Sequence, residues 1–244
     1  GSGGPNEVVP SYTGTPFYPK QSSQLACQPE STDGDVWVVN PDNDSIAIVT
    51  PNRDNESMQV SPTLVREIKL NYEAPTSVTQ IANFFAVTHR DDDKVVFYDD
   101  AGYPQFSIDT GHGTQPISSV SDDNYLFVAL YGSGEVIKIS PTERSILARI
   151  HVGPTPKAMA LHENRLLVTR FISPAQNGEV YDIDTNGNMA LTRTIMINKV
   201  LVGDDIDHGS GVPNYLSSIV ITADGTQAYV TATKANTDRG TRHT

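Results

Sequence analysis

The feature of this 244-residue chain that most constrains its fold is an internal repeat of short β-type segments. Five runs of β-branched, aromatic and aliphatic residues align with one another. Clusters of glycine, asparagine, aspartate and proline separate them, which is typical of strands joined by turns. The aligned segments are Val36–Asn40, Phe85–His89, Leu126–Leu130, Leu166–Arg170 and Ala228–Ala232. Such self-similarity indicates a repeat architecture in which each unit is one small sheet.

The spacing around these segments repeats as well. In three units a proline stands at the same distance before the penultimate residue of the aligned segment, as Pro75 stands before Thr88. The strand that follows the segment also ends at one fixed distance in three units, but later in the fourth, where Ser173–Gln176 enlarges the hairpin. A propeller blade takes roughly 40 to 45 residues. The second and third intervals between successive aligned segments match this length. The first interval and especially the fourth are longer, so the first and fourth units carry insertions.

Each unit therefore contains an inner strand after the proline, the aligned second strand, a third strand and an outer strand. The outer strands, such as Val65–Leu70 and Ile146–Ile150, carry charged residues that protect a solvent-facing sheet edge. We predict an all-β fold, a β-propeller of four-stranded antiparallel blades over residues 20–244. The inner strands are expected to open at Pro75, Pro116, Pro156 and Pro213.

About four and a half blades are predicted, because the fifth unit stops at Thr244, just past its hairpin turn. We expect an open arc that is part of a seven-bladed ring, completed by missing blades or by a companion chain. A compact closed ring of four or five blades is the alternative. Residues 1–19 form an N-terminal extension, in which Asn6–Tyr12 is a candidate closing outer strand. The open face of the first blade is expected to expose Leu25, Ala26 and Trp37, and either a companion segment or self-association is expected to cover it.

Two sets of residues resemble known families. Val38–Asn40 followed by Asp44–Ile48 resembles the YVTN β-propeller repeat, and this resemblance covers roughly residues 20 to 240. Gly211–Leu216, Asp224–Gly225 and Lys234–Gly240 are similar to large bacterial cell-surface propeller proteins. The second resemblance implies a cytochrome-c-like region with haem motifs in or after the propeller. No CxxCH motif for such a haem is present in these 244 residues.

Composition narrows the functional classes. The formal net charge is −12, which disfavours nucleic-acid binding because the chain would repel a phosphate backbone. The longest apolar runs fall well short of the roughly 18 residues that a transmembrane helix needs. The single cysteine, Cys27, excludes an internal disulfide and is expected to be a small buried core residue. The start Gly1–Gly4 fits either a tag remnant or the beginning of a mature exported protein or lipoprotein.

The candidate ligand site is the rim reached by the ends of the second strands and by the connections between blades. We expect it to combine histidine, asparagine and arginine side chains, with the arginines contacting anions. The predicted rim residues are Asn40, His89, His112, Arg170, His208 and Arg239. Three of these are histidines and would suit copper, zinc or iron, but solvated loop histidines are the simpler interpretation.

The predicted metal site is an acidic insertion. Oxygen-rich loops with glycine suit calcium, and Asp204, Asp205 and Asp207 are the candidate ligands. Asp91–Asp93 is interpreted as a hairpin turn. No catalytic motif is present, so no cofactor is assigned to this chain apart from that calcium. We predict an extracytoplasmic module that binds a protein or a surface ligand. Its expected location is the periplasm or the cell surface, and attachment by a lipid anchor is an open alternative. The alternative is the propeller portion of a haem-dependent redox enzyme.

Overall fold

The computed structural model describes residues 20–28, 34–53, 60–122, 124–201 and 210–235, and its regular structure is almost entirely β-strand. Consecutive strands form antiparallel sheets, here numbered as blades 1 to 5 in chain order. Blades 1 and 2 contain β2 (Leu25–Cys27), β3 (Val36–Asn40), β4 (Ser45–Arg53) and β5 (Val60–Lys69), then β6 (Pro75–Ile81), β7 (Phe84–His89), β8 (Lys94–Tyr98) and β9 (Pro104–Asp109).

Blades 3 and 4 repeat this order, and blade 4 gains an extra strand, β1, at its inner edge. Blade 5 has two strands among the described residues. Blade 3 contains β10 (Pro116–Ser121), β11 (Leu126–Leu130), β12 (Glu135–Ser140) and β13 (Ser145–His151). Blade 4 contains β1 (Lys20–Gln21), β14 (Pro156–His162), β15 (Arg165–Arg170), β16 (Asn177–Asp184) and β17 (Ala190–Asn198). The described strands of blade 5 are β18 (Val212–Ile221) and β19 (Ala228–Ala235). The single described helix is the 3-10 turn η1 (Pro41–Asn43), so none in the described part is long and apolar enough to cross a membrane.

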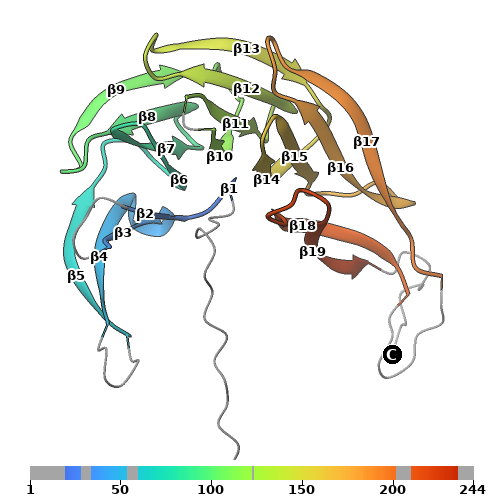
Figure 1. Ribbon diagram of the computed structural model, residues 1–244, viewed down its shortest axis with the longest axis horizontal. Helices are drawn as coiled ribbons and strands as arrows, with labels where there is room; N and C mark the ends of the chain where they lie inside the picture. The colour runs from blue at the N-terminus through green and yellow to red at the C-terminus, as the bar shows by residue number, and fades with distance from the viewer. Residues whose placement is uncertain (1–19, 29–33, 54–59, 123, 202–209, 236–244) are drawn as a thin grey trace, which may run out of the picture.

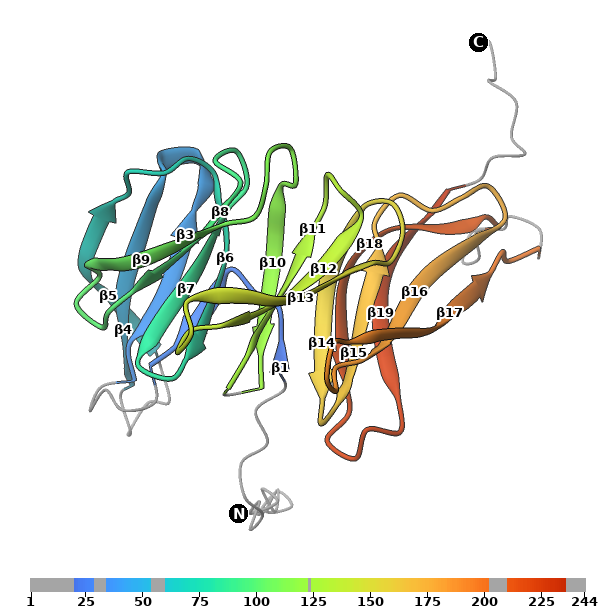
Figure 2. The ribbon, with the colours of Figure 1, turned by 90° about the horizontal axis from the view of Figure 1, so that it is seen from above.

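The blades stand side by side around an arc, with the first strand of each blade on the inside and the fourth on the outside (Figures 1 and 2). This arrangement confirms the predicted β-propeller fold. Blades 1 and 5 lie at opposite ends of the arc with open space between them, so the described residues do not form the compact closed ring (Figure 1). The predicted closing strand Asn6–Tyr12 lies outside the described residues.

The prolines mark the inner strands as predicted. β6, β10 and β14 begin at Pro75, Pro116 and Pro156, and β18 begins one residue before Pro213. Each of these strands has a bulge shortly after its proline, where the register to the second strand shifts. A proline suits this place because it has no N–H to contribute to the ladder.

The threonine of the second strand joins neighbouring strands and blades. Thr169 Oγ1 accepts the Ala158 N–H at 3.0 Å and donates to the Leu216 carbonyl of blade 5 at 2.8 Å. Thr88 Oγ1 likewise accepts the N–H of Ser77 at 3.0 Å. The repeated threonine is therefore a structural hydrogen-bonding residue close to the axis.

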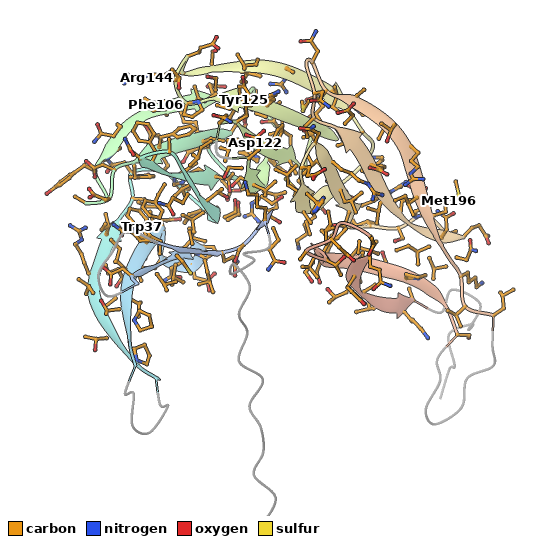
Figure 3. All side chains as sticks on the ribbon, in the orientation of Figure 1. Trp37, Phe106, Asp122, Tyr125, Arg144 and Met196 are labelled. Carbon is orange, nitrogen blue, oxygen red and sulfur yellow. The ribbon has the colours of Figure 1, made fainter. Side chains whose placement is uncertain are left out.

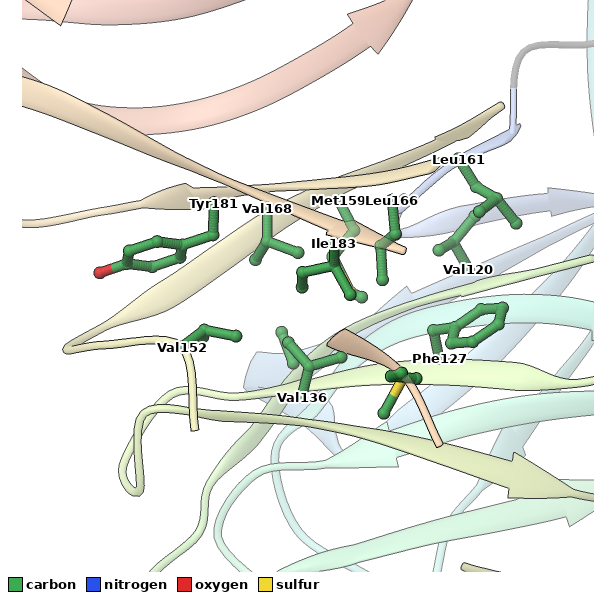
Figure 4. Packing of buried hydrophobic residues seen from close by; sticks show 12 residues of the cluster. Val120, Phe127, Val136, Val152, Met159, Leu161, Leu166, Val168, Tyr181 and Ile183 are labelled. Atoms are coloured by element: carbon green, nitrogen blue, oxygen red, sulfur yellow. The ribbon is translucent and has the colours of Figure 1, made fainter. Parts of the chain in front are cut away.

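Alternating side chains of each strand pack against the next blade. Figure 4 shows the contact between blades 3 and 4, where Phe127 and Val136 meet side chains of β14, β15 and β16. The period of two follows from the pleat of a strand. Full burial of each such side chain contributes roughly 1.5–3 kcal/mol. Each inter-blade contact is therefore one layer of a divided hydrophobic core.

The outer face of blade 1 differs from the prediction in two residues. Leu25 is 51% exposed, as predicted. Ala26, however, is half-buried and packs against the core between blades 1 and 2, and Trp37 is fully buried. The Trp37 ring points toward blade 2 and stacks on Phe85, with ring centroids 4.0 Å apart and planes 3° apart. The expected burial of Cys27 is also wrong. Cys27 lies two residues from Leu25 on the same strand, on the face that no described blade covers.

A strap of five residues, Lys20–Gln24, crosses from blade 4 to blades 1 and 2. β1 pairs with the inner strand of blade 4, and the Ser22 N–H donates to the Met159 carbonyl at 2.8 Å. The next carbonyls accept N–H groups from the other blades, Ser23 from Val78 and Gln24 from Val39, both at 3.1 Å. The strap therefore connects the inner strands β14 and β6 with β3, the second strand of blade 1, and it lies beside β14 in Figure 1.

Candidate functional site

The residues that end the second strands do not share an exposed rim. His89 and its counterpart Leu130 are fully buried, and Asn40 is half-buried. Arg170 is partly buried and held in place, because its Nη1 donates to the Glu179 carboxylate at 2.8 Å and its Nε to the Ile172 carbonyl at 2.9 Å. These positions therefore support the rim from below.

The other predicted residues divide into two groups. His112 is exposed on the connection into blade 3, with its Nδ1 3.9 Å from Asp93 Oδ2. The rest lie outside the described residues: His208, Arg239, Asp204, Asp205 and Asp207. The ranges that the structure describes contain no group of three or more histidine, cysteine, aspartate or glutamate side chains that could hold a metal ion. The predicted calcium site stays a prediction.

His89 lies in a buried aromatic pocket. Its Nε2 is 3.3 Å from the Tyr98 hydroxyl, and its ring centroid is 5.3 Å from that of Tyr72. Burial lowers the pKa of His89 to about 4, against the opposing effects of the Glu73 backbone and the Asp92 charge. Burial also raises the pKa of the Tyr98 hydroxyl well above its usual range. His89 is therefore a neutral core residue at neutral pH.

Asp91–Asp93 forms a turn as predicted, and Asp93 also orders the connection that follows blade 2. The Asp93 carboxylate accepts the N–H of Gly113 at 2.6 Å and that of Gln115 at 2.8 Å, and its carbonyl accepts the N–H of Thr110 at 2.9 Å. Its φ of 53° lies in the left-handed region, which aspartate tolerates better than most residues. Asp44 takes the same place in blade 1, where it accepts the Ala74 N–H at 2.8 Å.

The rim begins one residue after the predicted positions, at the exposed Arg90 and the half-buried Tyr131 and Phe171. Their N–H groups donate to the carbonyls of the residues that precede the prolines, at 3.0, 3.0 and 2.8 Å. The three acceptor residues are Ala74, Gln115 and Thr155. Equal backbone anchoring in three blades places these side chains at equivalent points of the rim.

A hollow of about 370 Å³ lies between these blades. This volume is within the range of small-molecule sites, which is roughly 300–1,000 Å³. Blade 2 contributes a guanidinium and a carboxylate, blade 3 an amide and a phenol, and blade 4 an ammonium and a phenyl ring. The lining residues are Arg90, Asp91, Gln115, Ile117, Tyr131, Lys157 and Phe171.

Aromatic rings form a row along one side of this hollow. The ring centroids of Tyr131 and Phe171 are 6.3 Å apart, and those of Phe171 and Tyr215 are 5.1 Å apart. Tyr215 comes from β18, so the row spans blades 3, 4 and 5. Aromatic side chains offer flat apolar surface together with polar edges, which suits ring-shaped ligands.

Lys157 supplies the unusual charge of the site. Its Nζ lies 3.8 Å from the centroid of the Phe171 ring, and burial lowers the pKa of its ammonium group. The neighbouring cations are neutralised, since Arg90 Nε is 2.7 Å from Asp91 Oδ1 and Arg170 pairs with Glu179. Among the described residues, no carboxylate or hydrogen-bond acceptor pairs with the Lys157 ammonium. The hollow therefore offers one uncompensated cation on an aromatic face.

Sequence reasoning missed Lys157 and the aromatic row for a local reason. The repeat marks where each second strand ends, but the chain turns over the strand end before a side chain reaches the rim. One signal was present in the sequence: Tyr131 and Phe171 occupy the same position after their aligned segments, as does Arg90.

Comparison with known proteins supports the fold alone. No family model matches the chain, and a search of curated proteins found no match. The structure resembles hydrazine synthase of Kuenenia stuttgartiensis, with a TM-score of 0.67 and 17% identity over 86% of this chain and 56% of that chain. This chain thus spans a little over half the length of the matched chain.

Two further structures resemble it with lower TM-scores. The WD40 domain of Toxoplasma gondii coronin has a TM-score of 0.59 and 12% identity over 86% of this chain and 53% of that one. Virginiamycin B lyase of Staphylococcus aureus has a TM-score of 0.52 and 16% identity over 75% of this chain and 56% of that one. These proteins differ widely in their named functions, so the shared propeller does not identify an activity.

Proposed function

We propose that this chain is an extracytoplasmic binding module of the YVTN propeller type, and that it binds an acidic carbohydrate at the rim hollow. The observation that supports this proposal is the Lys157 ammonium, which faces an aromatic ring and has no carboxylate partner among the described residues. A ligand carboxylate would supply the missing partner. Electrostatic attraction at a partly buried position is stronger than in open water.

The rest of the hollow suits a hydroxylated ring. Phe171 and Tyr131 provide flat apolar surface for the C–H face of a sugar, and Gln115 provides amide donors and an acceptor. The Arg90 and Asp91 pair at the opposite side can donate to and accept from hydroxyl groups. A rigid rim with a few polar groups on an apolar floor is the usual composition of a small-ligand site.

Calorimetric titration with oligogalacturonate, and with a neutral galactose oligomer of equal length, tests the proposal. We expect binding of the acidic oligomer, weaker binding as salt increases, and at least tenfold weaker binding by Lys157→Met, equivalent to about 1.4 kcal/mol. Phe171→Leu should weaken binding of the acidic oligomer as well. Lys69→Met is the matched control, because Lys69 is an exposed lysine on blade 1, away from the hollow.

Two results would count against this function. Equal affinity for the acidic and neutral oligomers would remove the role of the charge. Unchanged affinity in Lys157→Met, with a melting temperature equal to that of the parent chain, would remove the role of Lys157. The haem-dependent alternative depends on a region outside these 244 residues and stays a prediction.

A further inference from the structure

The faces of blades 2 and 3 each carry a small platform of three side chains, one from each of the second, third and fourth strands. In blade 2 the platform consists of Phe84, Phe97 and Phe106, whose ring centroids lie 4.3–6.2 Å apart. In blade 3 the equivalent positions are Tyr125, Lys138 and Ala148, as the strand registers show. We call such a set of three positions a seat.

Each of these seats receives the turn between the third and fourth strands of the following blade. Arg144, from that turn of blade 3, lies 4.8 Å from the Phe106 ring of blade 2, and Figure 3 shows the two side by side. Lys138 Nζ of blade 3 donates to the carbonyls of Thr185 and Gly187, in the turn of blade 4, at 3.1 and 3.4 Å. The seat is therefore a repeated contact between neighbouring blades.

Blade 1 has a related contact at its outer strand. A Cβ added at Gly102, in the turn of blade 2, would overlap Ile68 Cδ1 and lie 3.8 Å from Trp37. The backbone of that turn thus packs directly on blade 1. Three successive pairs of blades hold the turn of the later blade against the face of the earlier one.

In blade 4 the seat consists of Arg165, Asp182 and Arg193, and it lines an open hollow of about 610 Å³. The register places Arg165, Asp182 and Arg193 at the positions that Tyr125, Lys138 and Ala148 occupy in blade 3. Blade 5 consists of β18 and β19 in the described part of the chain, so no third-to-fourth-strand turn covers this seat there.

The chemistry of the blade 4 seat indicates what it binds. The Asp182 carboxylate accepts two N–H bonds from Arg165, at 3.0 and 2.9 Å, and one from Arg193 Nε at 2.9 Å. Burial raises the pKa of Asp182, but these hydrogen bonds outweigh it and lower the pKa. The three seat residues together carry one net positive charge, and the carboxylates of Glu163 and Asp184 line the same hollow beside them. Within the described residues, Arg165 Nη1 and both Nη groups of Arg193 donate to no acceptor.

We propose that the blade 4 seat binds the turn of a β-hairpin that adds to the edge of β19 not paired by any described strand, and that this hairpin completes blade 5. The turn presents oxygen acceptors, either backbone carbonyls or a carboxylate, to the unused N–H groups of Arg165 and Arg193. The contact is equivalent to that of Lys138 in blade 3 with the Thr185 and Gly187 carbonyls of blade 4, but it lies between blades 4 and 5. The binding partner is thus a polypeptide outside the described residues, and the proposal is independent of the rim hollow.

A graft of the chain's own outer hairpin tests this proposal. Thr233–Thr244 is replaced by a copy of Phe171–Asn198, which carries the third strand, the turn and the fourth strand of blade 4. Hydrogen exchange of β19 and modification of Arg165 and Arg193 by phenylglyoxal are measured with and without the graft. We expect at least tenfold slower exchange in Ala228–Ala232 and at least tenfold slower modification of both arginines. Arg66, on the outer strand of blade 1, is the internal control and should react equally in both chains.

A second variant separates the seat from simple edge pairing. Arg165, Asp182 and Arg193 are all replaced by serine, which removes the charged donors without leaving a buried carboxylate unpaired and without creating an apolar seat like that of blade 2. In the grafted chain that carries this triple variant, hydrogen exchange in the copied turn should be faster than in the grafted chain without it. Equally slow exchange in the triple variant would overturn the proposal. So would a graft that leaves β19 and both arginines as reactive as in the parent chain.

Discussion

Replacement of His89 by leucine is expected to remove most of the dependence of stability on pH between pH 8 and pH 5. Burial lowers the pKa of His89 from 6.5 to about 4, so the folded protein binds a proton less readily than the unfolded chain in this range. The contribution of neutral His89 is fully present above pH 6.5 and is lost as the pH falls toward 4. With these two pKa values, the loss by pH 5 is about 2 kcal/mol.

The repeat itself provides the substitution. Leu130 occupies the aligned position in blade 3 and is fully buried, so leucine fits this place in a blade. His89→Leu alone would leave the Tyr98 hydroxyl without its partner, which costs roughly 1–3 kcal/mol at every pH. The double variant His89→Leu, Tyr98→Phe removes that effect and is the better test.

Urea unfolding at several pH values, followed by far-ultraviolet circular dichroism, measures the effect. The difference in unfolding free energy between pH 8 and pH 5 should shrink by about 2 kcal/mol in the double variant relative to the parent. The carboxylates whose pKa values lie below the ordinary range, such as Asp109, ionise fully above pH 5 and do not interfere. An equal pH dependence in parent and variant would show that His89 is solvated or paired in solution.

Three further changes test the connections between blades and the predicted metal site. Asp93→Asn should lower the unfolding free energy by roughly 1–3 kcal/mol, because two amide groups lose a charged acceptor. Asp100→Asn, at an exposed turn of blade 2, is the comparison by urea unfolding. Gly132→Ala should destabilise the protein because the added Cβ would overlap the Gly113 carbonyl oxygen, whereas Gly187→Ala meets no atom within 4 Å and should show only the strain of its positive φ. If Asp204, Asp205 and Asp207 bind calcium, EDTA should lower the melting temperature, and an unchanged melting curve would exclude that site.

The sequence predicted the blades because their strand order depends on local features that repeat. Turn residues, prolines and alternating apolar residues fall at the same offsets in each unit, and the structure confirms the strands that follow from them. The two sides of a strand are a different matter. Leu25 and Trp37 lie on different strands, so alternation along each strand does not say whether they share a face. That depends on the pairing register of the two strands. Trp37 therefore lies on the face of blade 1 opposite to the predicted one.

The candidate sites depend on contacts between side chains of different strands and blades, which a repeat does not encode. Arg165, Asp182 and Arg193 are far apart in the sequence, and their ion pairs follow only from the register of β15, β16 and β17. Lys157 lies on an inner strand that the repeat marks as core. Its side chain reaches the rim because the bulge after Pro156 changes the direction of the strand. Burial of His89 likewise depends on the Tyr72 connection from the preceding blade.

The strap Lys20–Gln24 leads to a last prediction, because it makes blade 4 depend on residues that precede blade 1. The Ser22 hydroxyl accepts the N–H of Met159, a fully buried residue, at 2.9 Å. Ser22→Ala leaves that N–H without an acceptor and should lower the unfolding free energy by roughly 1–3 kcal/mol. Ser23→Ala is the matched control, since within the described ranges the Ser23 hydroxyl accepts only the exposed N–H of Leu25, at 3.0 Å. Hydrogen exchange should accelerate at Met159 in Ser22→Ala and stay unchanged there in Ser23→Ala. Equal exchange at Met159 in both variants would show that the strap does not hold blade 4 in solution.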